Sequence, residues 1–262
     1  MRNQAQPTDS YARYPSLEDR VVVITGGASG IGAAMVEAFA GQRATVVFLD
    51  IHDTAAEQLV QKIETTGLRP PLYYRCDLTD IAALQSTTVS ILERFSTVDV
   101  LINNAGNDTR HSIEEVTPSL WDQTMALNLK HQFFMAQAVI PTMQRAGRGS
   151  ILNLSSISWL IPSIHLPVYV TAKAAIVGMT RTLAHELGTH NIRVNAILPG
   201  AILTERQKQL WFTPDYQAEI LERQALKRLI LPEEVARLAV FLASDDSAAI
   251  TNQSYAIDGG WT

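Results

Sequence analysis

Short apolar runs alternate along the chain with longer segments in which apolar positions recur at helical spacing. The apolar runs predict strands at 21–24, 45–49, 72–76, 100–102, 150–154, 193–198 and 254–257. The longer segments predict helices at 31–40, 54–64, 81–95, 118–145, 168–188 and 232–243. Within the strands the apolar residues are continuous, which is typical of strands buried on both faces. The pattern predicts an α/β protein with a doubly wound, parallel, seven-stranded sheet.

Two segments fall outside this alternation. Residues 201–227 are amphipathic, carry aromatic side chains and lie between a predicted strand and a predicted helix, as an active-site lid would. Residues 1–16 are a polar N-terminal extension without the apolar core of a signal peptide. Because no linker or repeat divides the chain, we expect residues 1–262 to form a single domain with a small helical lid.

Composition narrows the classes of function. The formal net charge of −5 argues against a nucleic-acid or anionic-membrane partner. No run of about 18 apolar residues predicts a membrane span. The lone Cys76 excludes an internal disulfide. The histidines lack metal-ligand spacing, and His131 is interpreted as a helix-surface or interface residue. We therefore expect a cytoplasmic protein without a metal site.

A glycine-rich turn follows the first predicted strand and precedes the first helix. Gly26, Gly30 and Gly32 allow a tight turn and a close approach of the backbone to a pyrophosphate, which the helix N-terminus would face. Asp50 ends the second strand roughly 20 residues later, where a carboxylate binds the ribose hydroxyls of a dinucleotide. The negative charge of the Asp50 carboxylate would repel the 2′-phosphate of NADP, so the sequence favours NAD as the cofactor. The alternative is a glycine-rich loop that serves packing only.

Tyr169 and Lys173 share one face of a predicted helix, and Ser156 follows the fifth strand. To act as a base, Tyr169 needs its pKa lowered from about 10 to near 7, which corresponds to roughly 4 kcal/mol. A cation at about 4 Å supplies that much, so we expect Lys173, aided by a nicotinamide ring, to lower it. Ser156 would hold the substrate oxygen. The alternative is a buried tyrosine with a lysine beside it and a serine that satisfies a strand end.

Together these motifs resemble the classical short-chain dehydrogenase/reductase family over about residues 17–261. The resemblance is carried by Thr25–Gly32, Asp77, Asn103–Gly106, Asn128, Ser156, Tyr169, Lys173, Pro199–Gly200 and Thr204. It implies a Rossmann fold and hydride transfer to a nicotinamide. It further implies that Tyr169 is the acid/base, that Lys173 holds the ribose and that Ser156 positions the substrate. Asn128 would support a proton-relay water near Lys173.

The family also implies the cofactor site and the assembly. The expected cofactor residues are Gly26, Ser29, Gly30, Ile31, Gly32, Asp50, Ile51, Asp77, Leu78, Asn104, Ala105, Gly106, Tyr169, Lys173, Pro199, Gly200, Ile202 and Thr204. Most members are tetramers or dimers joined through the helices that here hold Asn128 and Tyr169, so we expect a homotetramer or a dimer.

A narrower similarity is to bacterial aldose 1-dehydrogenases of the D-xylose type, which oxidise a cyclic sugar at C1 to its lactone with NAD. It is carried by segments 14–17, 48–51, 104–108, 156–159, 211–214 and 258–261. Polar residues and two tryptophans follow the strands and occupy the lid, as a sugar site requires. The expected substrate residues are Asn107, Arg110, Ser156, Ser158, Trp159, His165, Tyr169, Gln207 and Trp211.

Other interpretations remain open at this point. Asp108 and His111 also follow the fourth strand, and any of these polar side chains could instead be solvated or lie at a subunit interface. The substrate could be another polyol, a secondary alcohol or ketone, or a sugar acid, with NAD or NADP. A non-catalytic dinucleotide-binding protein is a third hypothesis, against which the intact set of Ser156, Tyr169 and Lys173 argues.

Overall fold

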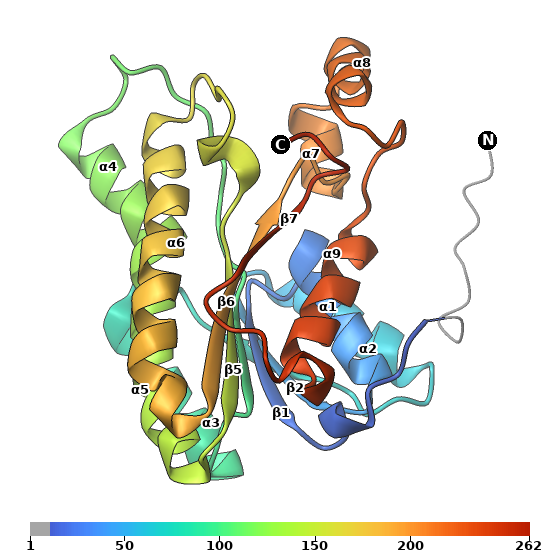
Figure 1. The fold of residues 1–262 in the computed structure, drawn as a ribbon, viewed down its shortest axis with the longest axis vertical. Helices are drawn as coiled ribbons and strands as arrows, with labels where there is room; N and C mark the ends of the chain where they lie inside the picture. The colour runs from blue at the N-terminus through green and yellow to red at the C-terminus, as the bar shows by residue number, and fades with distance from the viewer. Residues whose placement is uncertain (1–10) are drawn as a thin grey trace.

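Seven strands form one parallel sheet in the computed structural model, which describes residues 11–262 (Figure 1). The strand order is β3-β2-β1-β4-β5-β6-β7, so the order reverses between β1 and β4. The predicted fold class is confirmed. The strands are β1 (Val21–Thr25), β2 (Thr45–Asp50), β3 (Leu72–Arg75), β4 (Val100–Asn103), β5 (Gly149–Leu154), β6 (Ile192–Pro199) and β7 (Ser254–Ile257).

Helices cover both faces of the sheet (Figure 1). On one face lie α1 (Gly30–Gly41), α2 (Asp53–Glu64) and α9 (Pro232–Ala243). On the other lie α3 (Ile81–Phe95), α4 (Pro118–Met125), α5 (His131–Ala146) and α6 (Pro167–Leu187).

Strand β1 shows why its apolar run is continuous. All of its residues are buried. Val22 and Ile24 pack in the core beneath α1, α2 and α9, whereas Val21 and Val23 pack in the core beneath α3, α5 and α6. Because successive side chains of a strand point to opposite faces, a sheet covered twice needs an apolar residue at every position.

The predicted helix over 118–145 is not one α-helix. Thr117 caps its start, where Thr117 Oγ1 accepts a hydrogen bond from the Leu120 backbone N at 3.2 Å, and Pro118 follows. A π-helical segment, Ala126–Lys130, then separates α4 from α5. Periodicity alone does not detect one extra residue in a turn, and such segments concentrate at functional sites.

Two smaller expectations were wrong. The helix predicted to begin at residue 54 begins at Asp53, and His52 occupies the cap position. His131 is fully buried rather than on a helix surface. Its Nε2 lies 3.1 Å from the carbonyl oxygen of Ala105, so the ring points toward the end of β4 and not outward.

The predicted lid contains two short helices, α7 (Glu205–Leu210) and α8 (Pro214–Arg223), which lie beyond the end of β6 near the C-terminus (Figure 1). Thr204 and Thr213 cap them through their side-chain oxygens. A parallel bridge joins Ile202 to Ile230. The lid is therefore a long insertion, and the Ile202–Ile230 bridge holds its two ends next to each other.

Of the predicted N-terminal extension, residues 1–10 lie outside the described residues. The rest packs on the face of α1 and α9. The Tyr14 backbone N donates to Gln42 Oε1 at 2.7 Å, and the Tyr14 ring lies 6.3 Å from that of Phe241, centroid to centroid. Within residues 11–262, no helix has the length and apolarity needed to cross a membrane.

Candidate active site

A cavity of about 510 Å³ opens at the carboxyl ends of the strands, beside the point where the strand order reverses. Ligands of open α/β sheets bind at this position because the loops after β1 and β4 separate there. The glycine-rich turn, the ends of β2 to β6 and the lid all contribute to its wall. Every residue predicted above for cofactor binding lines this cavity.

Two positions of the glycine-rich turn, Gly26 and Gly32, have room for glycine only. Gly26 has φ +66°, and a Cβ there would lie 2.9 Å from the Cα of Ala105. A Cβ on Gly32 would lie 1.9 Å from the carbonyl oxygen of Gly26. Ser29, the N-cap of α1, forms no side-chain capping bond. The first N–H groups of α1 therefore stay available to an anion in the cavity.

Residues at the end of β4 hold this turn in place. Asn104 Nδ2 donates to the carbonyl oxygens of Thr25 and Gly26, each at 3.0 Å. In return, Thr25 Oγ1 accepts from the backbone N–H groups of Asn104 at 3.0 Å and Ala105 at 3.1 Å. The loop that faces a pyrophosphate is thereby fixed to the neighbouring strand before any ligand binds.

Asp50 is buried at the end of β2 and has a defined orientation. Its Oδ2 accepts from the Ala28 backbone N at 2.9 Å, and its Oδ1 accepts from Ile51 N at 2.7 Å and His52 N at 3.1 Å. A carboxylate has about four acceptor positions, so one remains for a ribose hydroxyl. With the free helix N-terminus, this set of donors and acceptors fits a nicotinamide dinucleotide.

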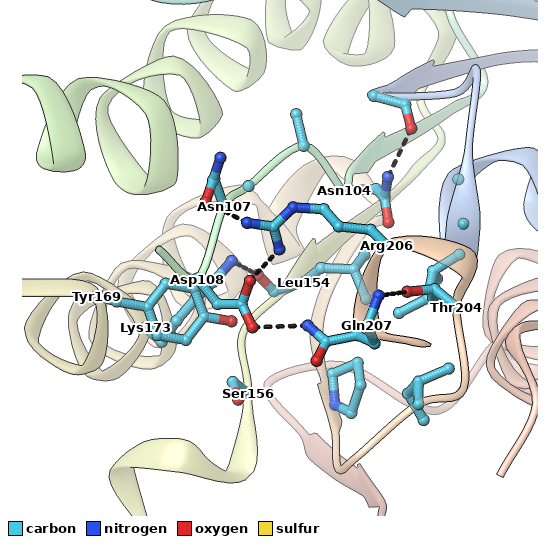
Figure 2. Close-up of a pocket in the computed structure, with 18 of the residues that line it drawn as sticks. Asn104, Asn107, Asp108, Leu154, Ser156, Tyr169, Lys173, Thr204, Arg206 and Gln207 are labelled. Carbon is cyan, nitrogen blue, oxygen red and sulfur yellow. Dashed lines mark hydrogen bonds and ion pairs between the residues drawn. The ribbon is translucent and has the colours of Figure 1, made fainter. Parts of the chain in front are cut away.

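Of the predicted catalytic residues, Ser156, Tyr169 and Lys173 line the cavity (Figure 2). Tyr169 and Lys173 are one turn apart on α6, and Lys173 Nζ lies 5.5 Å from the Tyr169 ring centroid. Lys173 Nζ donates to the carbonyl oxygen of Leu154 at 2.9 Å. The Ser156 hydroxyl accepts from the Ser158 backbone N at 3.1 Å, and its interaction with Tyr169 favours the phenolate.

The pKa of Tyr169 differs from the expectation. Burial raises it above its ordinary value and the Asp108 carboxylate raises it further, while the hydrogen bond with Ser156 and the Arg206 guanidinium act in the opposite direction. Burial also lowers the pKa of Lys173 to about 8. Lys173 alone therefore does not lower the pKa of Tyr169 in the unliganded protein, because desolvation disfavours the phenolate.

Asn128 lies in the π-helical segment and is buried behind the wall of the cavity. Its Nδ2 donates to the Thr124 carbonyl oxygen at 3.0 Å, and its Oδ1 accepts from the Asn107 backbone N at 2.9 Å. A Cβ on Gly106 would lie 3.0 Å from Asn128 Oδ1 and 3.2 Å from Lys173 Nζ. Asn128 is thus brought close to Lys173.

The part of the cavity beside the lid carries several polar side chains as well as apolar ones. Asp108 forms an ion pair with Arg206 of the lid and accepts from Gln207 Nε2 at 2.6 Å (Figure 2). The Arg110 guanidinium lies over the Trp211 ring at 4.2 Å from its centroid, and at 5.8 Å from that of Tyr216.

The structure brings only some of the predicted substrate residues to the cavity. Trp159, His165 and Trp211 do not line it. Trp159 packs with the apolar cluster of Ile157, and the Trp211 ring is occupied by Arg110, whereas the His165 carbonyl accepts from the His111 backbone N at 2.7 Å. Those that do line it are Asn107, Arg110, Ser156, Ser158, Tyr169 and Gln207.

Sequence reasoning missed Arg206 and Tyr216, which also line the cavity. The available signal was their place in the lid, but an arginine on an amphipathic helix is normally a solvated residue. Within residues 11–262, no group of three or more His, Cys, Asp or Glu side chains could hold a metal ion. Burial lowers the pKa of His131 to about 3, so this side chain is neutral.

A doubly wound sheet with a dinucleotide crevice and a Ser, Tyr and Lys set beside it defines a nicotinamide-dependent oxidoreductase. The family model described as "Enoyl-(Acyl carrier protein) reductase" matches residues 26–262. The chain belongs to the short-chain dehydrogenase/reductase family.

Relatives of known name cover almost the whole chain. A probable galactose dehydrogenase of Rhizobium meliloti is 47% identical over 249 residues, which is 95% of this chain and 97% of the relative. A D-xylose 1-dehydrogenase of Caulobacter vibrioides is 47% identical over 252 residues, or 96% and 99%. A structure of 7α-hydroxysteroid dehydrogenase complexed with NADH and 7-oxo glycochenodeoxycholic acid matches with TM-score 0.89 and 32% identity over 94% of this chain and 96% of that one.

Proposed function

We propose that the protein oxidises an aldose, a pentose or a hexose, at C1 and transfers the hydride to NAD, giving the aldonolactone. The observation that carries this proposal is the set of polar side chains that line the cavity together with Tyr169, namely Asn107, Asp108, Arg110 and Gln207. A sugar needs several directional hydrogen bonds, whereas a steroid or an acyl chain would be held by a mostly apolar wall. The names of the two sugar-dehydrogenase relatives support the same substrate class.

Each of the four catalytic side chains has a separate role in this reaction. Tyr169 takes the proton of the C1 hydroxyl, and Ser156 donates a hydrogen bond to the same oxygen as charge develops on it. Lys173 holds the ribose and, through its positive charge, favours the phenolate of Tyr169. A bound oxidised nicotinamide would accept the hydride and add a further positive charge. Asn128 supports a water that passes the proton toward solvent.

NAD is the proposed cofactor in preference to NADP, because the Asp50 carboxylate would face a 2′-phosphate with like charge. We further propose a cytoplasmic homotetramer or dimer, joined through the helices that hold Asn128 and Tyr169. Trp121 of α4 and Phe133 of α5 are exposed large apolar side chains on that side of the sheet. An apolar surface of this kind is typical of subunit contacts.

The test is a cofactor-reduction assay with pentoses, hexoses, 6-deoxy sugars and polyols, each with NAD and with NADP. We expect turnover of at least one aldose with NAD and lactone as the first product, detected with hydroxylamine. Turnover of polyols or other secondary alcohols alone would assign the enzyme to another substrate class. If no pentose or hexose is oxidised with NAD, the sugar assignment is wrong.

A further inference from the structure

Side chains of the loop after β4 and of the lid helix α7 are joined beside the cavity, and the Asp108 carboxylate makes two of these contacts. Asp108 is ion-paired with Arg206 and accepts the hydrogen bond of Gln207, and these partners come from 98 and 99 residues further along the chain. Arg206 Nη2 also donates to Asn107 Oδ1 at 3.0 Å. Figure 2 shows the Asp108 carboxylate between Arg206, Gln207 and the catalytic side chains.

Asp108 still has acceptor capacity that faces the cavity. Arg206 and Gln207 use two of the roughly four acceptor positions of its carboxylate. Its side chain is only 21% exposed and lines the cavity. After burial, its charge is the main influence that raises the pKa of Tyr169. The carboxylate is therefore close to the place where the substrate reacts.

We propose that Asp108 is the specificity-determining residue for uncharged polyhydroxylated substrates. Its carboxylate accepts hydrogen bonds from substrate hydroxyl groups, repels a carboxylate on the substrate, and anchors the lid through Arg206 and Gln207. This proposal rests on the proposed function, since it specifies which members of the sugar class that site takes.

Arg206 does not offer a free cation to an acidic substrate, because Asp108 already neutralises it. An acidic substrate that captured Arg206 would leave Asp108 without its counter-charge in a largely buried position, which is strongly unfavourable. The pair therefore favours neutral sugars over sugar acids.

The first experiment compares matched neutral and acidic substrates. D-Glucuronate is D-xylose with a carboxylate added at C5, and D-galacturonate is D-galactose with C6 oxidised to a carboxylate, so C1 is unchanged in both pairs. In Asp108→Asn we expect kcat/KM for the neutral sugar to fall by about 10- to 100-fold. The ratio of neutral to acidic sugar should fall at least about tenfold, because the acid no longer meets a like charge.

Glu222→Gln is the matched control, because Glu222 is an exposed carboxylate of the lid that does not line the cavity. It should keep the wild-type ratio. If Asp108→Asn does not fold, as judged by its melting transition, Asp108→Ser replaces it. A wild-type enzyme that prefers the uronate, or an unchanged ratio in the Asp108 variant, overturns the specificity role.

The second experiment measures the lid anchor without turnover. Trypsin cleaves after Arg and Lys, and the sites within residues 201–227 are identified by mass spectrometry with and without NAD. Cleavage after Arg206 and Lys208 should be at least about tenfold faster in Asp108→Asn than in the wild type, and unchanged in Glu222→Gln. Cleavage at the wild-type rate overturns the anchoring role. Because this assay needs no substrate, it stays decisive even if the aldose panel refutes the proposed function.

Discussion

Replacing Gly32 by alanine tests whether the glycine-rich turn is fixed as the structure shows. The new Cβ would lie 1.9 Å from the Gly26 carbonyl oxygen, 2.8 Å from the Gly26 carbonyl carbon and 2.7 Å from Asn104 Nδ2. Non-bonded heavy atoms are comfortable at about 3.5 Å, so the turn has to move by more than about 1 Å. The nearest atom, the Gly26 carbonyl oxygen, belongs to the backbone and cannot rotate away.

The expected loss is in both stability and binding. Overpacking of this kind costs about 1–3 kcal/mol, which lowers the melting temperature by about 2–4 °C for each kcal/mol in a chain of this size. The displaced turn carries the N–H groups that face the cofactor phosphates. Because a misplacement of about 1 Å in such sites costs up to about 100-fold, the Kd for NAD should rise by about 10- to 100-fold.

Gly41→Ala is the control at the other end of the same helix. A Cβ at Gly41 would meet nothing within 4 Å beyond the adjoining turns of its own helix, so alanine there should stabilise the protein by about 0.5–1 kcal/mol. Urea unfolding and calorimetric titration with NAD give both quantities. If Gly32→Ala unfolds at the wild-type midpoint and binds NAD with wild-type affinity, the reasoning about this turn is refuted.

Three further predictions concern the catalytic and cofactor residues. Tyr169→Phe should keep NAD binding while turnover falls by about 10²- to 10⁴-fold; unchanged turnover would remove the acid/base role. Asp50→Ala should raise the efficiency with NADP relative to NAD at least about tenfold, measured as the ratio of kcat/KM values, because the like charge near the 2′-phosphate is gone; an unchanged ratio would show that Asp50 does not select the cofactor. Since burial lowers the pKa of Lys173 from 10.5 to about 8, the unfolded state binds more protons between these pH values. The free energy of unfolding of the wild type should therefore rise relative to Lys173→Met by about 3 kcal/mol from pH 8 to 10.5, and parallel urea-unfolding profiles of the two proteins would contradict this.

Features that depend on residues close in sequence could be predicted from the sequence pattern alone. The apolar runs of β1 and β2 predicted strands buried on both faces, and the helix predicted from residue 118 begins at Pro118. Gly26 and Gly32 predicted a turn that only glycine fits, and helical spacing placed Tyr169 and Lys173 on one face. These signals are local because turn geometry and helical or strand period are set within a few residues.

The structure departs from expectation where a contact joins distant segments. Trp159 and Trp211 are of the residue type expected in a sugar pocket. In the structure, however, Trp159 packs in an apolar cluster and the Arg110 guanidinium lies over the Trp211 ring. His131 had the helical neighbours of a surface residue, yet its ring is buried against the end of β4. The π-helical segment that positions Asn128 adds one residue to a helical turn and so rotates the residues that follow it. The spacing of apolar residues in the sequence does not reveal this extra residue.

The chain by itself determined the layered α/β fold, the dinucleotide crevice and the Ser156, Tyr169 and Lys173 set. Only the tertiary structure decided the electrostatics of the site: the desolvation that raises the pKa of Tyr169, and the pairing of Asp108 with Arg206 across 98 residues. Burial and charge pairing depend on which distant groups share a low-dielectric space, and that is fixed only when the sheet, its helices and the lid have packed together.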